Sequence, residues 1–184
     1  MCSSDLMELL ISEGRILFPS KEDGRPREKK FRSEMQSEFI AFRTIIDGVY
    51  TADGTQEIRD LFGAEVFSFP KPCELLRRIV EQTTGEGDLV VDFFAGSGTT
   101  GHAVMSQNVI DQGKRRYILV QLPEPLDVGN RDQGVAASYC DQLGKPRSIA
   151  ELTKERLRRA AAKVKADNPM FADDTGFRDR KSVV

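Results

Sequence analysis

The sequence predicts an α/β fold built on an open, mostly parallel sheet. The short apolar run Leu89–Phe94, interrupted by Asp92, is typical of a buried strand, and Gly96-Ser-Gly98 follows it closely. A helix-like segment begins at Thr99, so the order is strand, glycine turn, helix. In open α/β sheets this order forms a small-molecule pocket at the carboxyl end of a strand, where the free N–H groups of the helix face the ligand.

The composition indicates one soluble domain of ordinary size. A chain of 184 residues can bury a sizeable core, and 27 basic against 29 acidic residues give no overall attraction to nucleic acid. No apolar stretch approaches the roughly 20 residues that span a bilayer, and no signal peptide is visible, which indicates a cytoplasmic protein without membrane contact. Three widely separated cysteines argue against a disulfide framework or a zinc site, so no metal site is expected.

The first fifty residues predict a short strand followed by a basic loop. Gly14–Phe18 is the strand candidate. The loop carries the candidate DNA-contacting residues Arg25, Arg27, Lys29 and Lys30. Two interpretations stay open, a solvated hairpin loop or a patch that contacts DNA phosphates without regard to base sequence.

Two helices are expected before the glycine turn. Thr55 as N-cap and Gly63 as stop predict a short helix. Pro72 suits the first position of a second helix, which Gly85 ends. This second helix has one apolar face and is expected to pack on the sheet. Its apolar residues are Leu75, Leu76, Ile79 and Val80.

Three helices and a second strand are expected from Thr99 onward. A helix runs from Thr99 to about Val109, and Tyr117–Leu122 is the second strand. Residues 131–143 can form a further helix. Ser148-Ile-Ala-Glu151 is a capping box that starts the clearest helix of the chain. That helix has one apolar face and a cationic remainder, predicted to be solvated or, alternatively, to face DNA. The cations are Lys154, Arg156, Arg158, Arg159, Lys163 and Lys165.

Two interpretations of the glycine turn compete. Gly96-Ser-Gly-Thr-Thr-Gly101 fits the Gly-x-Gly-x-x-Gly fingerprint of dinucleotide-binding proteins, which is a weak signal when it stands alone. Asp92 precedes the first glycine by four residues, and a carboxylate there suits a ligand with an ammonium group better than one with a pyrophosphate. A turn without any ligand is disfavoured, because a buried aspartate needs a partner that offsets its desolvation.

Two motifs of the chain, the glycine turn and a proline-containing segment before it, lie about 20 residues apart. Residues 92–100, Asp-Phe-Phe-Ala-Gly-Ser-Gly-Thr-Thr, resemble the S-adenosylmethionine motif of amino-methyltransferases that act on DNA. Phe-Pro-Lys-Pro at 69–72, followed by Leu75, matches the second wall of that cofactor pocket. With residues 117–124 and 149–160 included, the chain resembles the C-terminal part of the modification (Mod) subunit of bacterial type III restriction–modification systems.

The resemblance implies transfer of a methyl group from S-adenosyl-L-methionine to the exocyclic amino group of adenine in double-stranded DNA. It implies a doubly wound, Rossmann-like methyltransferase sheet, a homodimer of Mod subunits and association with a restriction (Res) subunit. At the cofactor it implies Gln121 or Glu124 on the ribose. The other cofactor residues carried over are Lys71, Pro72, Leu75, Asp92, Phe93, Phe94, Gly96, Ser97, Gly98 and Thr99.

The catalytic Asp-Pro-Pro-Tyr motif of that family does not occur in these 184 residues. No catalytic residue is therefore assigned, the sheet is expected to be incomplete, and the chain alone is expected to be inactive. Residues 7–50 are expected to be a connector with the basic loop, and residues 51–178 the cofactor-binding half. Residues 1–6 and 179–184 resemble a translated sequencing adapter and are expected to be non-native.

Two other functions stay open at this point. A nicotinamide or flavin oxidoreductase would use the literal glycine fingerprint and has no use for Phe-Pro-Lys-Pro. A non-enzymatic DNA-binding or subunit-assembly module would use the basic loop and the cationic helix.

Overall fold

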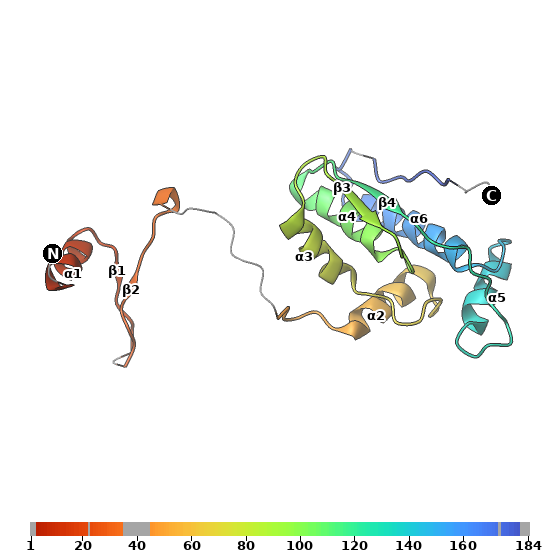
Figure 1. The fold of residues 1–184 in the computed structure, drawn as a ribbon, viewed down its shortest axis with the longest axis horizontal. Helices are drawn as coiled ribbons and strands as arrows, with labels where there is room; N and C mark the ends of the chain where they lie inside the picture. Colours follow the sequence, from red (N-terminus) through yellow and green to blue (C-terminus); the bar gives the residue numbers. More distant parts are fainter. Residues whose placement is uncertain (1–2, 22, 35–44, 173, 181–184) are drawn as a thin grey trace. The chain divides into compact units, whose positions relative to one another are not determined.

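The computed structural model describes residues 3–21, 23–34, 45–172 and 174–180. Contacts divide the chain into two compact units, Met1–Arg43 and Thr44–Val184 (Figure 1). Both units combine helices with short strands, which confirms the mixed α/β class predicted from the sequence.

The first unit is a small helix–hairpin assembly. The strand predicted at Gly14–Phe18 is confirmed in its central residues, which pair in antiparallel fashion with a second short strand. Arg15 Nη1 donates to Glu34 Oε2 at 2.8 Å, an exposed ion pair of the kind that adds little stability. The elements are α1 (Ser3–Ser12), β1 (Ile16–Leu17), β2 (Arg27–Glu28) and a 3-10 turn, η1 (Arg32–Glu34).

The second unit contains the predicted strand, turn and helix. Its elements are α2 (Thr51–Phe62), α3 (Cys73–Thr83), β3 (Leu89–Asp92), α4 (Thr99–Asp111), β4 (Arg116–Leu119), α5 (Gly134–Gln142) and α6 (Ile149–Asp167). Strands β3 and β4 pair in parallel from Leu89 with Arg116 to Asp92 with Leu119, and α4 connects them. This β–α–β unit is the local architecture that the glycine turn predicts.

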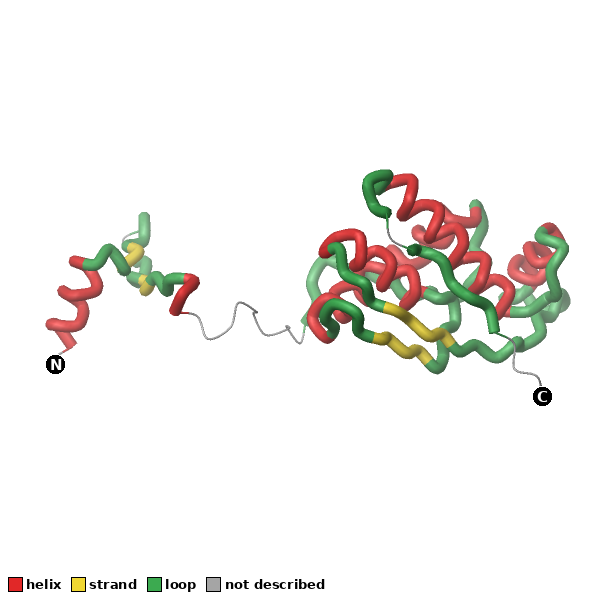
Figure 2. The backbone as a smooth tube through the Cα atoms, turned by 90° about the horizontal axis from the view of Figure 1, so that it is seen from above, coloured by secondary structure: helices red, strands yellow, loops and turns green. Residues whose placement is uncertain are grey.

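Helices cover one face of the strand pair. Tyr117 and Leu119 of β4 pack against Met105 of α4 and Leu157 of α6. The opposite face carries apolar side chains that stay 42–48% exposed, namely Leu89, Val91, Ile118 and Val120. In Figure 2 the strand pair accordingly lies at one side of this unit, with the long helices beyond it.

The prediction of a buried strand over Leu89–Phe94 is wrong in two respects. The outward face of the strand is exposed, because the described helices pack on the other face. The strand also ends at Asp92, whose Oδ1 accepts a hydrogen bond from the backbone N–H of Phe94 at 3.0 Å and turns the chain. Phe93 and Phe94 are therefore 68% and 90% exposed.

Some helix ends differ from the sequence prediction. Helix α2 starts before Thr55, because the Asp53 carboxylate accepts from the backbone N–H of Tyr50 at 2.8 Å and caps an earlier turn. Gly63 ends this helix in the left-handed region, as predicted. Pro72 is the N-cap of α3 rather than its first helical residue. Helix α5 is shorter than residues 131–143.

Two apolar clusters form the core. The first joins α2, α5 and α6 through the segment after α2, and Phe62 packs edge to face on Phe67 with ring centroids 6.1 Å apart. The second joins α4, β4 and α6 around Leu157. Helix α6 contributes to both clusters and thereby fixes the strand pair relative to α2 and α5. Within the described residues, no helix combines the length and apolar character needed to cross a bilayer.

Gly54 offers a test of the packing of α2 on the chain before α3. A Cβ atom at Gly54 would lie 2.2 Å from the carbonyl oxygen of Pro70 and 2.9 Å from the carbonyl carbon of Lys71. Replacing an exposed glycine inside a helix with alanine normally raises the free energy of unfolding by about 1 kcal/mol. We expect Gly54→Ala instead to lower the free energy of unfolding in urea by roughly 1–3 kcal/mol, because rigid backbone must move. Replacing the exposed Gln56 on the same helix with alanine should change the free energy of unfolding by no more than about 0.5 kcal/mol. A Gly54→Ala variant that is more stable than the unmodified chain would contradict this packing.

His102 predicts a pH dependence of stability. It is 8% exposed on α4, and burial, with smaller effects from Arg156 and Lys163, lowers its pKa to about 4. The unfolded chain, with an ordinary histidine pKa of about 6.5, binds more protons between these two values. As far as His102 is concerned, the free energy of unfolding is therefore highest above about pH 6.5. It falls by up to roughly 3 kcal/mol as the pH drops towards about 4.

The measurement for His102 is urea unfolding at several pH values. The chain has a single histidine, so the difference between a His102 variant and the unmodified chain in this window isolates the contribution of His102. His102→Leu should flatten the loss of stability between about pH 6.5 and pH 5. Equal slopes of the free energy of unfolding against pH in the variant and the unmodified chain would show that unfolding does not change the protonation of His102.

Candidate functional site

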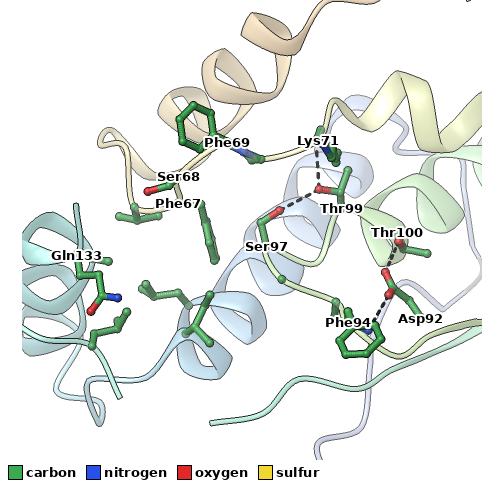
Figure 3. A pocket seen from close by; sticks show the side chains of 18 of the residues that line it. Phe67, Ser68, Phe69, Lys71, Asp92, Phe94, Ser97, Thr99, Thr100 and Gln133 are labelled. Atoms are coloured by element: carbon green, nitrogen blue, oxygen red, sulfur yellow. Dashed lines mark hydrogen bonds between the residues drawn. The ribbon is translucent and has the colours of Figure 1, made fainter. Parts of the chain in front are cut away.

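A cavity of about 480 Å³ opens beside the glycine turn (Figure 3). The turn after β3 forms one wall, and residues 66–71 before α3 form the facing wall. Residues of α5, α6 and the loop before α5 close the remaining side. The cavity therefore lies at the carboxyl end of a parallel strand, where ligands bind in open α/β sheets.

The glycine turn is held by side chains from later parts of the chain. Gly96 and Gly98 have φ angles of 51° and 78°, in the left-handed region that glycine adopts without strain. The backbone N–H of Gly96 donates to Gln121 Oε1 at 2.7 Å, and Thr153 Oγ1 donates to the Gly96 carbonyl at 2.5 Å. The turn is thus clamped between the residue after β4 and helix α6.

Asp92 lines the cavity at the start of this turn. Its Oδ1 accepts from the Phe94 N–H at 3.0 Å, and its Oδ2 accepts from Thr100 Oγ1 at 2.6 Å. The Thr100 hydroxyl thus offsets part of the desolvation of Asp92 that was expected to be offset by a ligand. An ionised carboxylate has about four acceptor positions, so Asp92 can accept further donors from the cavity.

The facing wall is tied to the turn by a hydrogen bond. Thr99 Oγ1 donates to the Lys71 carbonyl at 3.2 Å, and Figure 3 draws this hydrogen bond between the two residues. Beside them, Phe69 is 93% exposed and has a φ of 51°. A bulky residue in the left-handed region is strained, and such residues cluster at ligand sites.

The structure brings half of the predicted cofactor residues to the cavity. Those that line it are Lys71, Asp92, Phe94, Gly96, Ser97 and Thr99. Those that do not line it are Pro72, Leu75, Phe93, Gly98, Gln121 and Glu124. Gln121 bonds to Gly96 instead of facing the cavity, and Glu124 is exposed while its carbonyl accepts from the Ile149 N–H at 3.2 Å.

Several residues that line the cavity lie outside the sequence prediction. The additional apolar lining residues are Phe67, Leu126, Ala136, Ile149 and Leu152, and the additional polar ones are Ser68, Asp132 and Gln133. Figure 3 shows Gln133 across the cavity from the turn. The apolar periodicity of residues 149–164 could have indicated Ile149 and Leu152, whereas no local pattern marks the loop before α5.

Arg156 corrects the prediction of a solvated cationic face on α6. Its side chain is fully buried, because position 156 lies between Leu152 and Ala160 on the inward face of the helix. Arg156 Nη1 donates to Ser97 Oγ at 2.8 Å and to Thr99 Oγ1 at 2.6 Å. Its Nη2 lies 3.4 Å from Glu57 Oε2, which supplies the counter-charge.

Glu57 is half-buried and shared between two partners. Its two carboxylate oxygens each lie 2.9 Å from the Cys73 N–H, at the start of α3. Burial raises the pKa of the Glu57 carboxyl, although the Cys73 N–H and the positive charge of Arg156 act in the opposite direction. Burial likewise raises the pKa of the Cys73 thiol, to about 12, so this thiol stays protonated at neutral pH.

The candidate DNA-contacting residues lie in the first unit. Arg25, Arg27 and Lys30 are exposed on the hairpin, whereas Lys29 Nζ donates to the Gly14 carbonyl at 3.0 Å. Three of the four cations are thus available on the surface of the hairpin. Across the described ranges, no three histidine, cysteine, aspartate or glutamate side chains gather as metal ligands do.

Comparison with known proteins gives a consistent set of relatives. The StyLTI Mod subunit of a type III restriction-modification enzyme from Salmonella typhimurium strain LT2 is 42% identical over 126 residues, which cover 68% of this chain and 18% of the relative. The EcoP15I Mod subunit of Escherichia coli is 32% identical over 165 residues, covering 86% and 23%. The type II methyltransferase M.KpnI of Klebsiella pneumoniae is 40% identical over 77 residues, covering 42% and 18%.

The chain spans less than a quarter of the length of each of these relatives. A match to a whole family covers residues 15–121, which include the facing wall, the glycine turn and both strands of the parallel pair. That family is described as DNA methylase. With this match extending over more than half of its length, the chain belongs to the DNA methylase family.

Proposed function

We propose that this chain is the cofactor-binding part of a DNA adenine methyltransferase that acts as the modification subunit of a restriction–modification system. The observation that carries the proposal is one cavity whose two walls are the Asp92–glycine turn and the Phe-Pro-Lys-Pro segment. The hydrogen bond from Thr99 to the Lys71 carbonyl joins these walls. Membership of the DNA methylase family and similarity to proteins named Mod subunits support the reaction class.

The proposed ligand is S-adenosyl-L-methionine, which supplies an activated methyl group when bound. Asp92 would attract its ammonium group, and the hydroxyls and backbone of the 96–99 turn would meet the amino-acid end. The apolar lining residues Phe67 and Leu152 suit the adenine ring. A cavity of about 480 Å³ is within the range of small-molecule sites.

The ribose contact is proposed for Gln121 or Glu124, although neither side chain lines the cavity in this structure. Gln121 acts on the turn through Gly96, whereas Asp132 and Gln133 do line the cavity. Carboxylate and amide oxygens accept hydrogen bonds from hydroxyl groups. Asp132 and Gln133 therefore join Glu124 as candidates for the sugar.

The assignment gives this chain binding and orienting roles. Its sequence holds no Asp-Pro-Pro-Tyr motif, so no catalytic residue is assigned within it. Methyl transfer to an adenine amino group requires the target base outside the duplex stack and in line with the methyl donor. The 51–178 segment fixes the donor end of that alignment.

The fold proposed for this part is a doubly wound, Rossmann-like sheet. The parallel β3–α4–β4 unit supports this topology. Parallel sheets are normally covered on both faces. The exposed apolar face around Val91 and Ile118 is the surface that further elements of such a sheet would cover.

Double-stranded DNA, a second Mod subunit and a Res subunit are the proposed partners. Two relatives are named Mod subunits of type III restriction-modification enzymes, which supports association with other subunits. On this chain, Arg25, Arg27 and Lys30 of the hairpin are proposed to contact DNA phosphates.

Ligand titration tests the cofactor assignment. We expect the chain to bind S-adenosylhomocysteine, the stable product form of the cofactor, and not to bind NAD. Asp92→Asn should weaken binding about tenfold or more, because the amide keeps the acceptor for Phe94 but loses the charge that attracts an ammonium group.

Asp88→Asn provides the matched control for Asp92→Asn. Asp88 stands just before the same strand, and its carboxylate accepts from the Gly85 N–H at 2.8 Å. It lies outside the cavity lining, so its removal should leave affinity unchanged. Binding of NAD, or equal affinity of Asp92→Asn and the unmodified chain, would reject the assignment.

Salt-dependent binding to a mixed-sequence DNA duplex tests the hairpin. Replacing Arg25, Arg27 and Lys30 with glutamine should reduce the slope of log affinity against log salt by roughly 2 to 3, because each lost phosphate contact removes about 0.9. A variant with the same net charge, in which the exposed Lys114, Lys145 and Lys165 become glutamine, should keep the slope. Equal slopes in the two variants would indicate diffuse charge attraction and not a hairpin contact.

A further inference from the structure

Arg156 contacts the glycine turn from behind. It is fully buried and does not line the cavity. One nitrogen, Nη1, reaches both hydroxyls of the turn, Ser97 Oγ at 2.8 Å and Thr99 Oγ1 at 2.6 Å. Ser97 Oγ and Thr99 Oγ1 are themselves 3.0 Å apart, so the two acceptors form one compact pair.

The same guanidinium reaches the facing wall through two routes. Thr99 Oγ1 accepts from Arg156 and donates to the Lys71 carbonyl. On its other side, Arg156 pairs with Glu57, whose carboxylate accepts from the Cys73 N–H two residues after Lys71. One buried cation, the Arg156 guanidinium, is therefore linked by hydrogen bonds and an ion pair both to the glycine turn and to the facing wall.

The geometry depends on features that only arginine supplies. Its guanidinium is planar and presents donors at fixed angles, whereas a lysine ammonium is a point charge on a flexible stem. A rigid fork can hold Glu57 on one nitrogen and the two hydroxyls on the other. Because glycine adopts left-handed and right-handed backbone angles about equally readily, Gly96 and Gly98 leave the turn free to adopt other conformations unless such contacts restrain it.

We infer that Arg156, held by Glu57, is a positioning residue that sets the Ser97–Thr99 turn against the Lys71 wall and so shapes the amino-acid end of the cofactor site. The inference rests on the proposed function for the identity of the ligand. Arg156 acts through Ser97 and Thr99 and has no contact with the cavity itself.

The test compares two ligands that differ only at the end that the turn would hold. S-adenosylhomocysteine carries the amino-acid end, and 5′-methylthioadenosine has the same nucleoside thioether without it. Affinities are measured by calorimetry on the full 184-residue chain, well below its unfolding temperature. Arg156→Met should lower affinity for S-adenosylhomocysteine about tenfold or more and change affinity for 5′-methylthioadenosine by less than about threefold.

Arg159→Met is the matched control on the same helix. Arg159 donates to the Leu61 carbonyl at 2.9 Å and stacks on the Phe62 ring, 5.0 Å from its centroid, away from the turn. This variant should lose stability but keep both affinities. If Arg156→Met does not fold, Arg156→Lys, which keeps a cation for Glu57 but lacks the fork, is measured against the same criteria.

The outcomes separate this inference from the proposed function. If the unmodified chain binds neither ligand, the proposed function fails. If the unmodified chain binds S-adenosylhomocysteine and the Arg156 variant binds it equally well, the positioning role is rejected. Equal losses for both ligands would also reject it, because a general collapse of the cavity does not distinguish the two ends of the ligand.

Discussion

The guanidinium of Arg156 lies where α2, α6, the glycine turn and the start of α3 meet. A buried charge destabilises a protein strongly unless it is paired and hydrogen-bonded. Glu57 provides the counter-charge at 3.4 Å, and two hydroxyls accept from Nη1. Burial lowers the pKa of Arg156, yet an arginine stays protonated in proteins. Its charge must therefore be matched in every folded arrangement of this region.

The buried ion pair between Arg156 and Glu57 restricts how the surrounding elements can be arranged more than it stabilises the fold. Bringing both ions out of water offsets most of their attraction, so a well-packed apolar pair of similar size can be as stable. Any arrangement that separates Arg156 from Glu57 leaves an unpaired charge inside the core and is strongly penalised. Glu57 and Arg156 are 99 positions apart, so the pair links the start of the second unit to its last helix.

The parts of the site that could be predicted are local in the sequence. The strand, the glycine turn and the start of α4 follow from a run of twelve residues, 88–99, whose side chains and backbone preferences agree. The limits of the helices were less predictable where the cap is unusual. At α2, the carboxylate of Asp53 caps the backbone of a residue that precedes it, and Thr55 has no role as N-cap.

The tertiary parts of the site could not be predicted in the same way. Arg156 occupies an apolar-face position, four residues after Leu152 and four before Ala160, which is a signal that its charge obscured. Its partner Glu57 is distant in sequence, and no periodicity connects the two. The apolar run Leu89–Phe94, interrupted by Asp92, predicted a buried strand, but the described helices cover only one of its faces.

The glycine spacing itself encodes backbone and packing requirements that do not depend on the ligand. Gly96 and Gly98 adopt left-handed angles, and a Cβ atom on Gly101 would lie 2.7 Å from Leu157 Cδ2. A dinucleotide-binding fold needs glycines for these same reasons, so the literal fingerprint fits both classes of protein. The residues around the turn separate them. A pyrophosphate would bring negative charge against the Asp92 carboxylate, whereas an ammonium group would be attracted to it. We therefore propose that the strand residue before the turn, together with the wall that Thr99 ties to it, selects the ligand, and that the glycines only make the approach sterically open.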